Sequence, residues 1–151
     1  MRNPVLTLIV LAVSLLFFTS CKKEVDDDRD PNHPYNSLIV GSWKFESDSI
    51  IEENTGKVDR VIPAPTEVEQ ILSLRSDGSA EFNNGFGEVL KYDYYITKAG
   101  KFATKVEGEN SYSPGSDILL LNSTTFRIKG REYYTTSGGG RGYMTSTYKR
   151  K

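Results

Sequence analysis

The sequence has one cysteine, one histidine and almost no net charge. A single cysteine excludes a disulfide within the chain and a zinc site built on cysteines. A single histidine excludes a multi-histidine metal site. Lys and Arg number 19 against 20 Asp and Glu, whereas binding to nucleic acid by bulk charge requires a clear basic excess. We therefore expect no metal, no cofactor and no nucleic-acid partner.

The N-terminal region carries one apolar run, Val5–Phe18, preceded by Arg2. A helix that spans a membrane needs about 20 apolar residues, so this run is too short for one. A basic start, a short apolar run and small residues before Cys21 are typical of a secretory signal. Residues 1–20 are therefore predicted to be a signal peptide.

Thr19, Ser20 and Cys21 resemble a bacterial lipobox. The resemblance implies cleavage before Cys21 and lipidation of that residue, including a palmitate-like chain on its thiol. Each buried methylene contributes about 0.8 kcal/mol, so several acyl chains would hold the protein on a membrane. The implied location is the bacterial outer membrane, with the lipid anchor as the membrane partner.

Residues 21–34 are polar and mostly acidic, and they bury too little apolar surface to fold alone. We predict that they form a tether. Lys22 followed by an acidic run resembles the surface-export signal of Bacteroidota lipoproteins, which implies exposure at the cell surface.

From residue 35 onward, short apolar runs alternate with turn residues, and no helical period is sustained. We expect a helical turn at 35–40 and a loop at 54–65, where Gly56, Pro63 and Pro65 occur. The pattern predicts eight strands, at 41–51, 67–75, 79–83, 88–97, 102–107, 118–121, 123–135 and 142–149, with a bulge at Gly130. Residues 35–151 are thus predicted to form one all-β domain, an antiparallel up-and-down barrel.

Three segments resemble the lipocalin-like domains of Bacteroidota lipoproteins: residues 38–45, residues 74–80 and residues 147–150. The resemblance implies that Gly41 and Trp43 lie at the closed base of the barrel, beside a basic residue from the chain end. Arg150 is the residue in that position. It also implies noncatalytic binding of a small apolar or amphipathic molecule.

Strand alternation predicts which side chains point into the barrel. The aromatic members, which are the tentative ligand-binding residues, are Trp43, Phe45, Phe82, Tyr92, Tyr94, Phe102, Phe126, Tyr134 and Tyr148. The aliphatic members and the methionine are Leu72, Leu74, Leu90, Ile96, Val106, Leu119, Leu121, Ile128 and Met144. These side chains either line a ligand pocket or fill the core, because an eight-stranded barrel can do either.

Two other functions remain to be weighed. If the core is filled, the barrel is an interaction module that presents its loops to an envelope protein or a glycan. The pairs Glu67/Glu69 and Glu107/Glu109 place two carboxylates on one strand face, as a glycosidase could use. The apolar residues of the 67–75 strand take the other face, so its glutamates are expected to face water. No catalytic residues are predicted, and the protein is not expected to be an enzyme.

Overall fold

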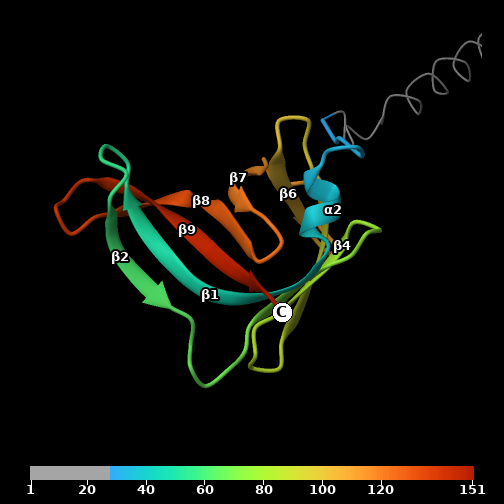
Figure 1. Ribbon diagram of the computed structural model, residues 1–151, viewed down its shortest axis with the longest axis horizontal. Helices are drawn as coiled ribbons and strands as arrows, with labels where there is room; N and C mark the ends of the chain where they lie inside the picture. The colour runs from blue at the N-terminus through green and yellow to red at the C-terminus, as the bar shows by residue number, and fades with distance from the viewer. Residues whose placement is uncertain (1–27) are drawn as a thin grey trace, which may run out of the picture.

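The computed structural model of the protein describes residues 28–151, except for the side chains of residues 131 and 132 (Figure 1). The predicted signal peptide, the lipidation site Cys21 and most of the predicted tether lie outside the described residues. The rest is one antiparallel sheet with a short helix, α2 (Tyr35–Ile39), before it. The strands are β1 (Gly41–Glu52), β2 (Val58–Pro63), β3 (Ile71–Leu74), β4 (Ser79–Asn83), β5 (Val89–Ile96), β6 (Lys101–Val106), β7 (Ser116–Leu121), β8 (Thr125–Thr135) and β9 (Arg141–Arg150).

The sheet closes into an eight-stranded barrel because β1 pairs with β9 as well as with β3. Strands β3 to β9 follow one another as hairpins, so the predicted up-and-down barrel is confirmed. The hairpin between β3 and β4 turns at Asp77 and Gly78, where Gly78 has φ +87°. The Asp77 carboxylate accepts a hydrogen bond from the Ser79 N–H at 2.9 Å, which stabilises the predicted Asp-Gly turn.

The ninth strand, β2, lies outside the barrel and corrects the prediction of a loop at 54–65. It pairs with the second half of β1, from Ser47 to Ile51. Nearly all of its side chains are exposed, so the sequence has no apolar alternation to mark it. Pro63 is its last residue, a position that an edge strand tolerates because no neighbouring strand needs its N–H. The following strand begins at Ile71 rather than at residue 67 because residues 64–70 connect β2 to β3.

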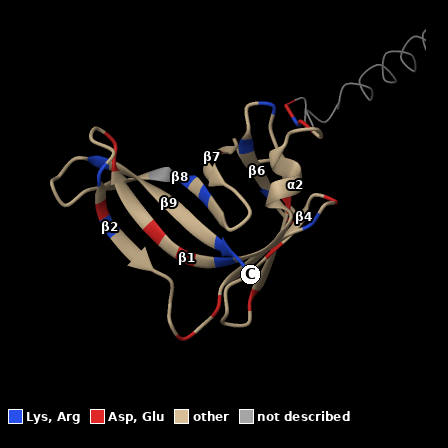
Figure 2. Cartoon of the chain, in the orientation of Figure 1, with Lys and Arg blue, Asp and Glu red and all other residues tan. Residues whose placement is uncertain are grey.

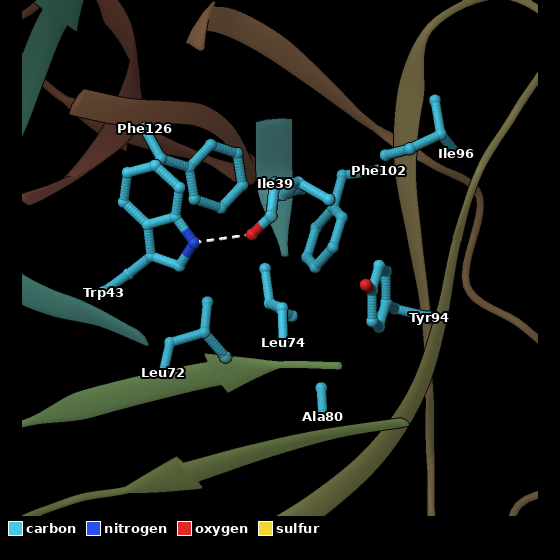
Figure 3. Packing of buried hydrophobic residues seen from close by; sticks show 9 residues of the cluster. All are labelled: Ile39, Trp43, Leu72, Leu74, Ala80, Tyr94, Ile96, Phe102 and Phe126. Atoms are coloured by element: carbon cyan, nitrogen blue, oxygen red, sulfur yellow. Dashed lines mark hydrogen bonds between the residues drawn. The ribbon is translucent and has the colours of Figure 1, made fainter. Parts of the chain in front are cut away.

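The helix α2 closes one end of the barrel. It lies where the sequence predicts a helical turn. Ile39, its last residue, is fully buried beside Trp43 of β1. The Trp43 indole Nε1–H donates a hydrogen bond to the Ile39 carbonyl at 2.7 Å (Figure 3). Phe126 packs against the Trp43 ring, with 5.7 Å between ring centroids. Within residues 28–151, no helix is long and apolar enough to cross a membrane.

The start of β1 and the end of β9 meet at this closed base. The Arg150 guanidinium lies over the Trp43 ring, 4.7 Å from its centroid, and donates a hydrogen bond to the Leu38 carbonyl at 3.1 Å. A Cβ on Gly41 would lie 2.8 Å from Arg150 Cζ, so only glycine leaves room for this arrangement. The expected contact between Trp43 and a basic residue near the chain end is therefore present.

The last part of the predicted tether, residues 28–34, lies against the barrel rather than extending from it as a loose coil. The Asp30 N–H donates a hydrogen bond to the Ile96 carbonyl, and Arg29 forms a β-bridge with Thr97. The Tyr95 hydroxyl donates to an Asp28 carboxylate oxygen at 2.7 Å. The chain therefore reaches the barrel at the end of β5 that α2 closes.

Substitution of Trp43 by alanine should lower the free energy of unfolding by about 3–5 kcal/mol, because it removes a fully buried aromatic side chain and its hydrogen bond. Urea unfolding followed by far-UV circular dichroism measures the change. Phe86→Ala is the control, since Phe86 is 68% exposed and its loss should change the free energy by no more than about 0.5 kcal/mol. Equal effects of the two substitutions would contradict the burial of Trp43 at the closed end of the barrel.

Candidate functional site

Along β5 and β6, the inward side chains become more exposed from one end of the barrel to the other. Along β5, Ile96 and Tyr94 are 0% and 5% exposed, whereas Leu90 is 46% exposed. Along β6, the exposed fraction rises from 6% at Phe102 to 40% at Val106. At β5 and β6 the barrel is therefore packed beside α2 and accessible to solvent at the opposite end, whereas the inward Ile50, beyond Asp48 on β1, is only 1% exposed.

The strand register shows that these exposed residues belong to the inner face. Leu90 pairs with Phe82 and Val106 pairs with Tyr92, and residues paired across antiparallel strands point to the same side. Leu90 and Val106 thus face inward as predicted but are not buried, because the barrel is open at their level. Leu119 does not face inward as predicted. A bulge between Ile118 and Leu120 turns it to the outer surface.

The structure divides the nine tentative ligand-binding residues into two groups and one outlier. Trp43, Tyr94, Phe102 and Phe126 are buried against one another at the closed end and fill it (Figure 3). Phe45, Phe82, Tyr92 and Tyr148 are half-buried and lie above that layer, toward the open end. Tyr134 is separate from both groups, since it pairs with Gly142 near the far end of the hairpin formed by β8 and β9.

The carboxylate of Asp48 lies on the same inner face as Phe45 and Tyr148, a position that strand alternation alone did not predict. Phe45 pairs with Tyr148 and Ser47 pairs with Thr147, so Glu46 is an extra residue in β1. This bulge reverses the alternation and brings Asp48 to the inner face, opposite Ser146. The Ser146 hydroxyl donates a hydrogen bond to Asp48 Oδ1 at 2.7 Å.

We call this inner surface at the open end the mouth. Its members share the inner register of the barrel strands and retain contact with solvent: Phe45, Asp48, Phe82, Leu90, Tyr92, Val106, Ile128, Met144, Ser146 and Tyr148. The rings of Phe45 and Tyr148 meet edge to face with centroids 5.6 Å apart, and Tyr148 stacks on Phe126 at 5.8 Å. The mouth therefore has an aromatic floor that continues the packed core.

Burial shifts the titration of the polar groups in the mouth. It raises the pKa of the Asp48 carboxyl above its ordinary value, although the hydrogen bond from Ser146 acts in the opposite direction. It also raises the pKa of the Tyr148 phenol, and the nearby charges of Asp48 and Tyr92 add to that shift. The Tyr92 phenol is shifted upward by burial as well. The mouth thus favours the neutral, protonated form of each of these groups.

Most other charges of the barrel lie on its outer face. Asp93 pairs with Lys105 at 3.0 Å, and Glu81 pairs with Arg75 at 2.8 Å. Charges of both signs are spread over the strands and turns rather than gathered in one region (Figure 2).

The four glutamates considered in the sequence analysis, and the basic residues Arg127 and Lys129 of β8, also face outward. Glu69 is exposed and pairs with Lys44 and Lys151, which lower its pKa. Arg127 and Lys129 pair with Thr147 and Thr145, on the face opposite Tyr148. Glu67, Glu107 and Glu109 are exposed as well.

Substitution of Asp48 by asparagine should stabilise the protein at neutral pH and have little effect in acid. Because the pKa of Asp48 is higher in the folded chain than its ordinary value of 3.8, the folded state holds the proton longer as the pH rises. The free energy of unfolding of the native protein therefore falls as the pH rises from about 3.8 through the raised pKa. The asparagine variant lacks this fall, so its advantage should grow across that window. Urea unfolding at a series of pH values measures it.

The matched control is Asp93→Asn, which removes an exposed carboxylate of the outer face. Its pair with Lys105 contributes about 0–1 kcal/mol, so this variant should be no more stable than the native protein at neutral pH. An Asp48→Asn variant that is less stable than the native protein at neutral pH would contradict the burial of the carboxylate.

No model of a known protein family matches the chain, and no curated protein is significantly similar to it. The assignment of a function therefore depends on the barrel, on its open end and on the residues that line that end.

Proposed function

We propose that this protein is a lipid-anchored envelope lipoprotein whose lipocalin-like barrel binds a small apolar or amphipathic molecule at its mouth, without catalysing a reaction. The observation that carries the proposal is the rise in exposure along the inner face, from fully buried Ile96 to 46% exposed Leu90. Apolar side chains that remain in contact with water are stabilised when a ligand covers them.

The closed base supports the comparison with lipocalins. Gly41 and Trp43 on the first strand, with Arg150 over the indole ring, match the arrangement that the sequence resemblance implies. A packed base with an open opposite end leaves one entrance, so the ligand would enter between the ends of β4, β5 and β6 near Leu90.

The position of the N-terminal segment supports display of this entrance away from the membrane. Residues 28–30 contact Ile96 and Thr97, at the closed end of the barrel. A lipid anchor at Cys21 would then hold the barrel by its closed end. The mouth, at the other end of β5, would face away from the anchor and toward ligands in solution.

Substitution of Leu90 by arginine should reduce ligand occupancy by about tenfold or more, because it places a long charged side chain in the mouth. Native mass spectrometry of the protein purified from cells measures occupancy as an additional mass that organic extraction removes. Leu120→Arg is the control, since Leu120 is 40% exposed but pairs with Arg127 on the outer face. No additional mass in the native protein would count against a binding barrel.

Substitution of Cys21 by alanine should abolish lipid attachment and release the protein from the membrane fraction. Metabolic labelling with an alkyne-bearing palmitate analogue reports the attachment, and fractionation reports the location. Ser20→Ala is the matched control, because alanine remains a small residue and should preserve labelling. A Cys21→Ala variant that still carries the label would exclude the proposed anchor.

A second candidate function, an interaction module, is favoured by the free edge of β2. Among the described residues, β2 pairs with β1 alone, and Val58, Val61 and Ile62 are exposed on it. An exposed edge strand with apolar side chains can accept a strand from a partner protein. This alternative requires no ligand in the mouth, so a protein that carries no additional mass would favour it.

A further inference from the structure

We propose that the molecule bound in the mouth carries a positively charged amine on a small apolar body, and that Asp48 binds the amine. The inference deepens the proposed function and rests on it. It follows from a carboxylate that forms no ion pair with a described Lys or Arg side chain, from the aromatic rings near it and from the positions of the other charges in the inner register of β1 and β2.

The first observation concerns the pairing of Asp48. Its hydrogen-bond partner is Ser146, whose hydroxyl donates to one carboxylate oxygen. No Lys or Arg side chain in the described part of the chain forms an ion pair with it, whereas outer-face carboxylates such as Asp93 and Glu81 have such pairs. A half-buried carboxylate without a cation is costly, and a cationic ligand would remove that cost.

The second observation concerns the aromatic side chains near Asp48. Phe45 and Tyr148 pair with each other and form the inward pair that precedes Asp48 and Ser146 on β1 and β9. Tyr92 is close enough to Tyr148 to influence its titration. A cation is attracted to the faces of aromatic rings, so a carboxylate combined with such rings favours an organic ammonium group. Beyond them, Phe82, Leu90 and Ile128 supply an apolar surface for the body of the molecule.

The third observation concerns the other charges in the inner register of β1 and β2. Glu52 lies beyond Ile50 at the end of β1, opposite Gly142. Arg60 is exposed on β2 opposite Ile50, whereas the position opposite Asp48 is Ile62. The causes that set the pKa of Asp48 are burial and Ser146, so Arg60 does not neutralise it. An anionic ligand would be repelled by the uncompensated charge of Asp48 and is therefore disfavoured.

Three probes with the same six-carbon chain test the inference: hexylammonium, 1-hexanol and hexanoate. Each is titrated at neutral pH into the full chain in phospholipid nanodiscs, with the methyl groups of Met144 and Ile128 observed by NMR because both lie in the inner register of the mouth. We expect hexylammonium to bind about tenfold more tightly than hexanol, and hexanoate to bind least tightly.

Two variants identify the group responsible. Asp48→Asn should reduce the preference for hexylammonium over hexanol to about twofold or less while hexanol binds as before. Asp93→Asn, which removes a carboxylate of the outer face, should keep the tenfold preference. Its retention of the preference would exclude a general effect of net charge.

The outcomes separate this inference from the proposed function. Equal binding of hexylammonium and hexanol, or a preference that persists in Asp48→Asn, would overturn the amine-binding role and leave a binding barrel in place. If none of the three probes shifts the methyl signals of the mouth, both proposals fail together and the interaction module based on β2 is favoured.

Discussion

The pairing of β1 with β9 is the constraint on which the rest of the structure depends. It runs from Trp43 opposite Arg150 to Glu52 opposite Gly142, and it joins the first and last strands of the domain. Without it the sheet would have two open edges and no enclosed core. The same ladder carries the Arg150 side chain to the Trp43 ring and over Gly41, where any larger residue would collide with the guanidinium.

The bulge in this ladder separates the two ends of the barrel in chemistry. Before Glu46, the inward positions of β1 are Trp43 and Phe45, and the core beneath them is apolar. After Glu46, the inward positions are Asp48, whose burial opposes its ionisation, and Ile50, which is 1% exposed. A sequence selected for stability alone would place an apolar or neutral side chain there. A residue that costs stability on the inner face of the barrel is consistent with the function that we propose for that surface.

The parts of the fold that could be predicted from the sequence are those in which apolar alternation and turn chemistry agree. β4, with Ala80 and Phe82 inward after the Asp-Gly turn, is one example. β2 could not be predicted, because its side chains are exposed and no alternation marks it. Leu119 was assigned to the wrong face and Asp48 was not assigned to the inner face, and both errors arise from bulges. Leu119 lies within a bulge, and Asp48 follows one. One extra residue in a strand reverses the inward positions after it.

The aromatic side chains show how one set of strands can provide both stability and a binding surface. Tyr94 is buried and its hydroxyl donates to the Arg75 carbonyl at 2.7 Å, so its hydrogen bonding is satisfied within the fold. Tyr92, two residues earlier on the same face of β5, is half-buried, and no hydrogen bond to its hydroxyl is part of the described network. Tyr94 thus belongs to the packed layer, whereas Tyr92, nearer the open end, has a hydroxyl that a ligand could contact. Because the packed layer holds the floor of the mouth rigid, a ligand there would meet a preformed surface and lose little free energy in ordering it.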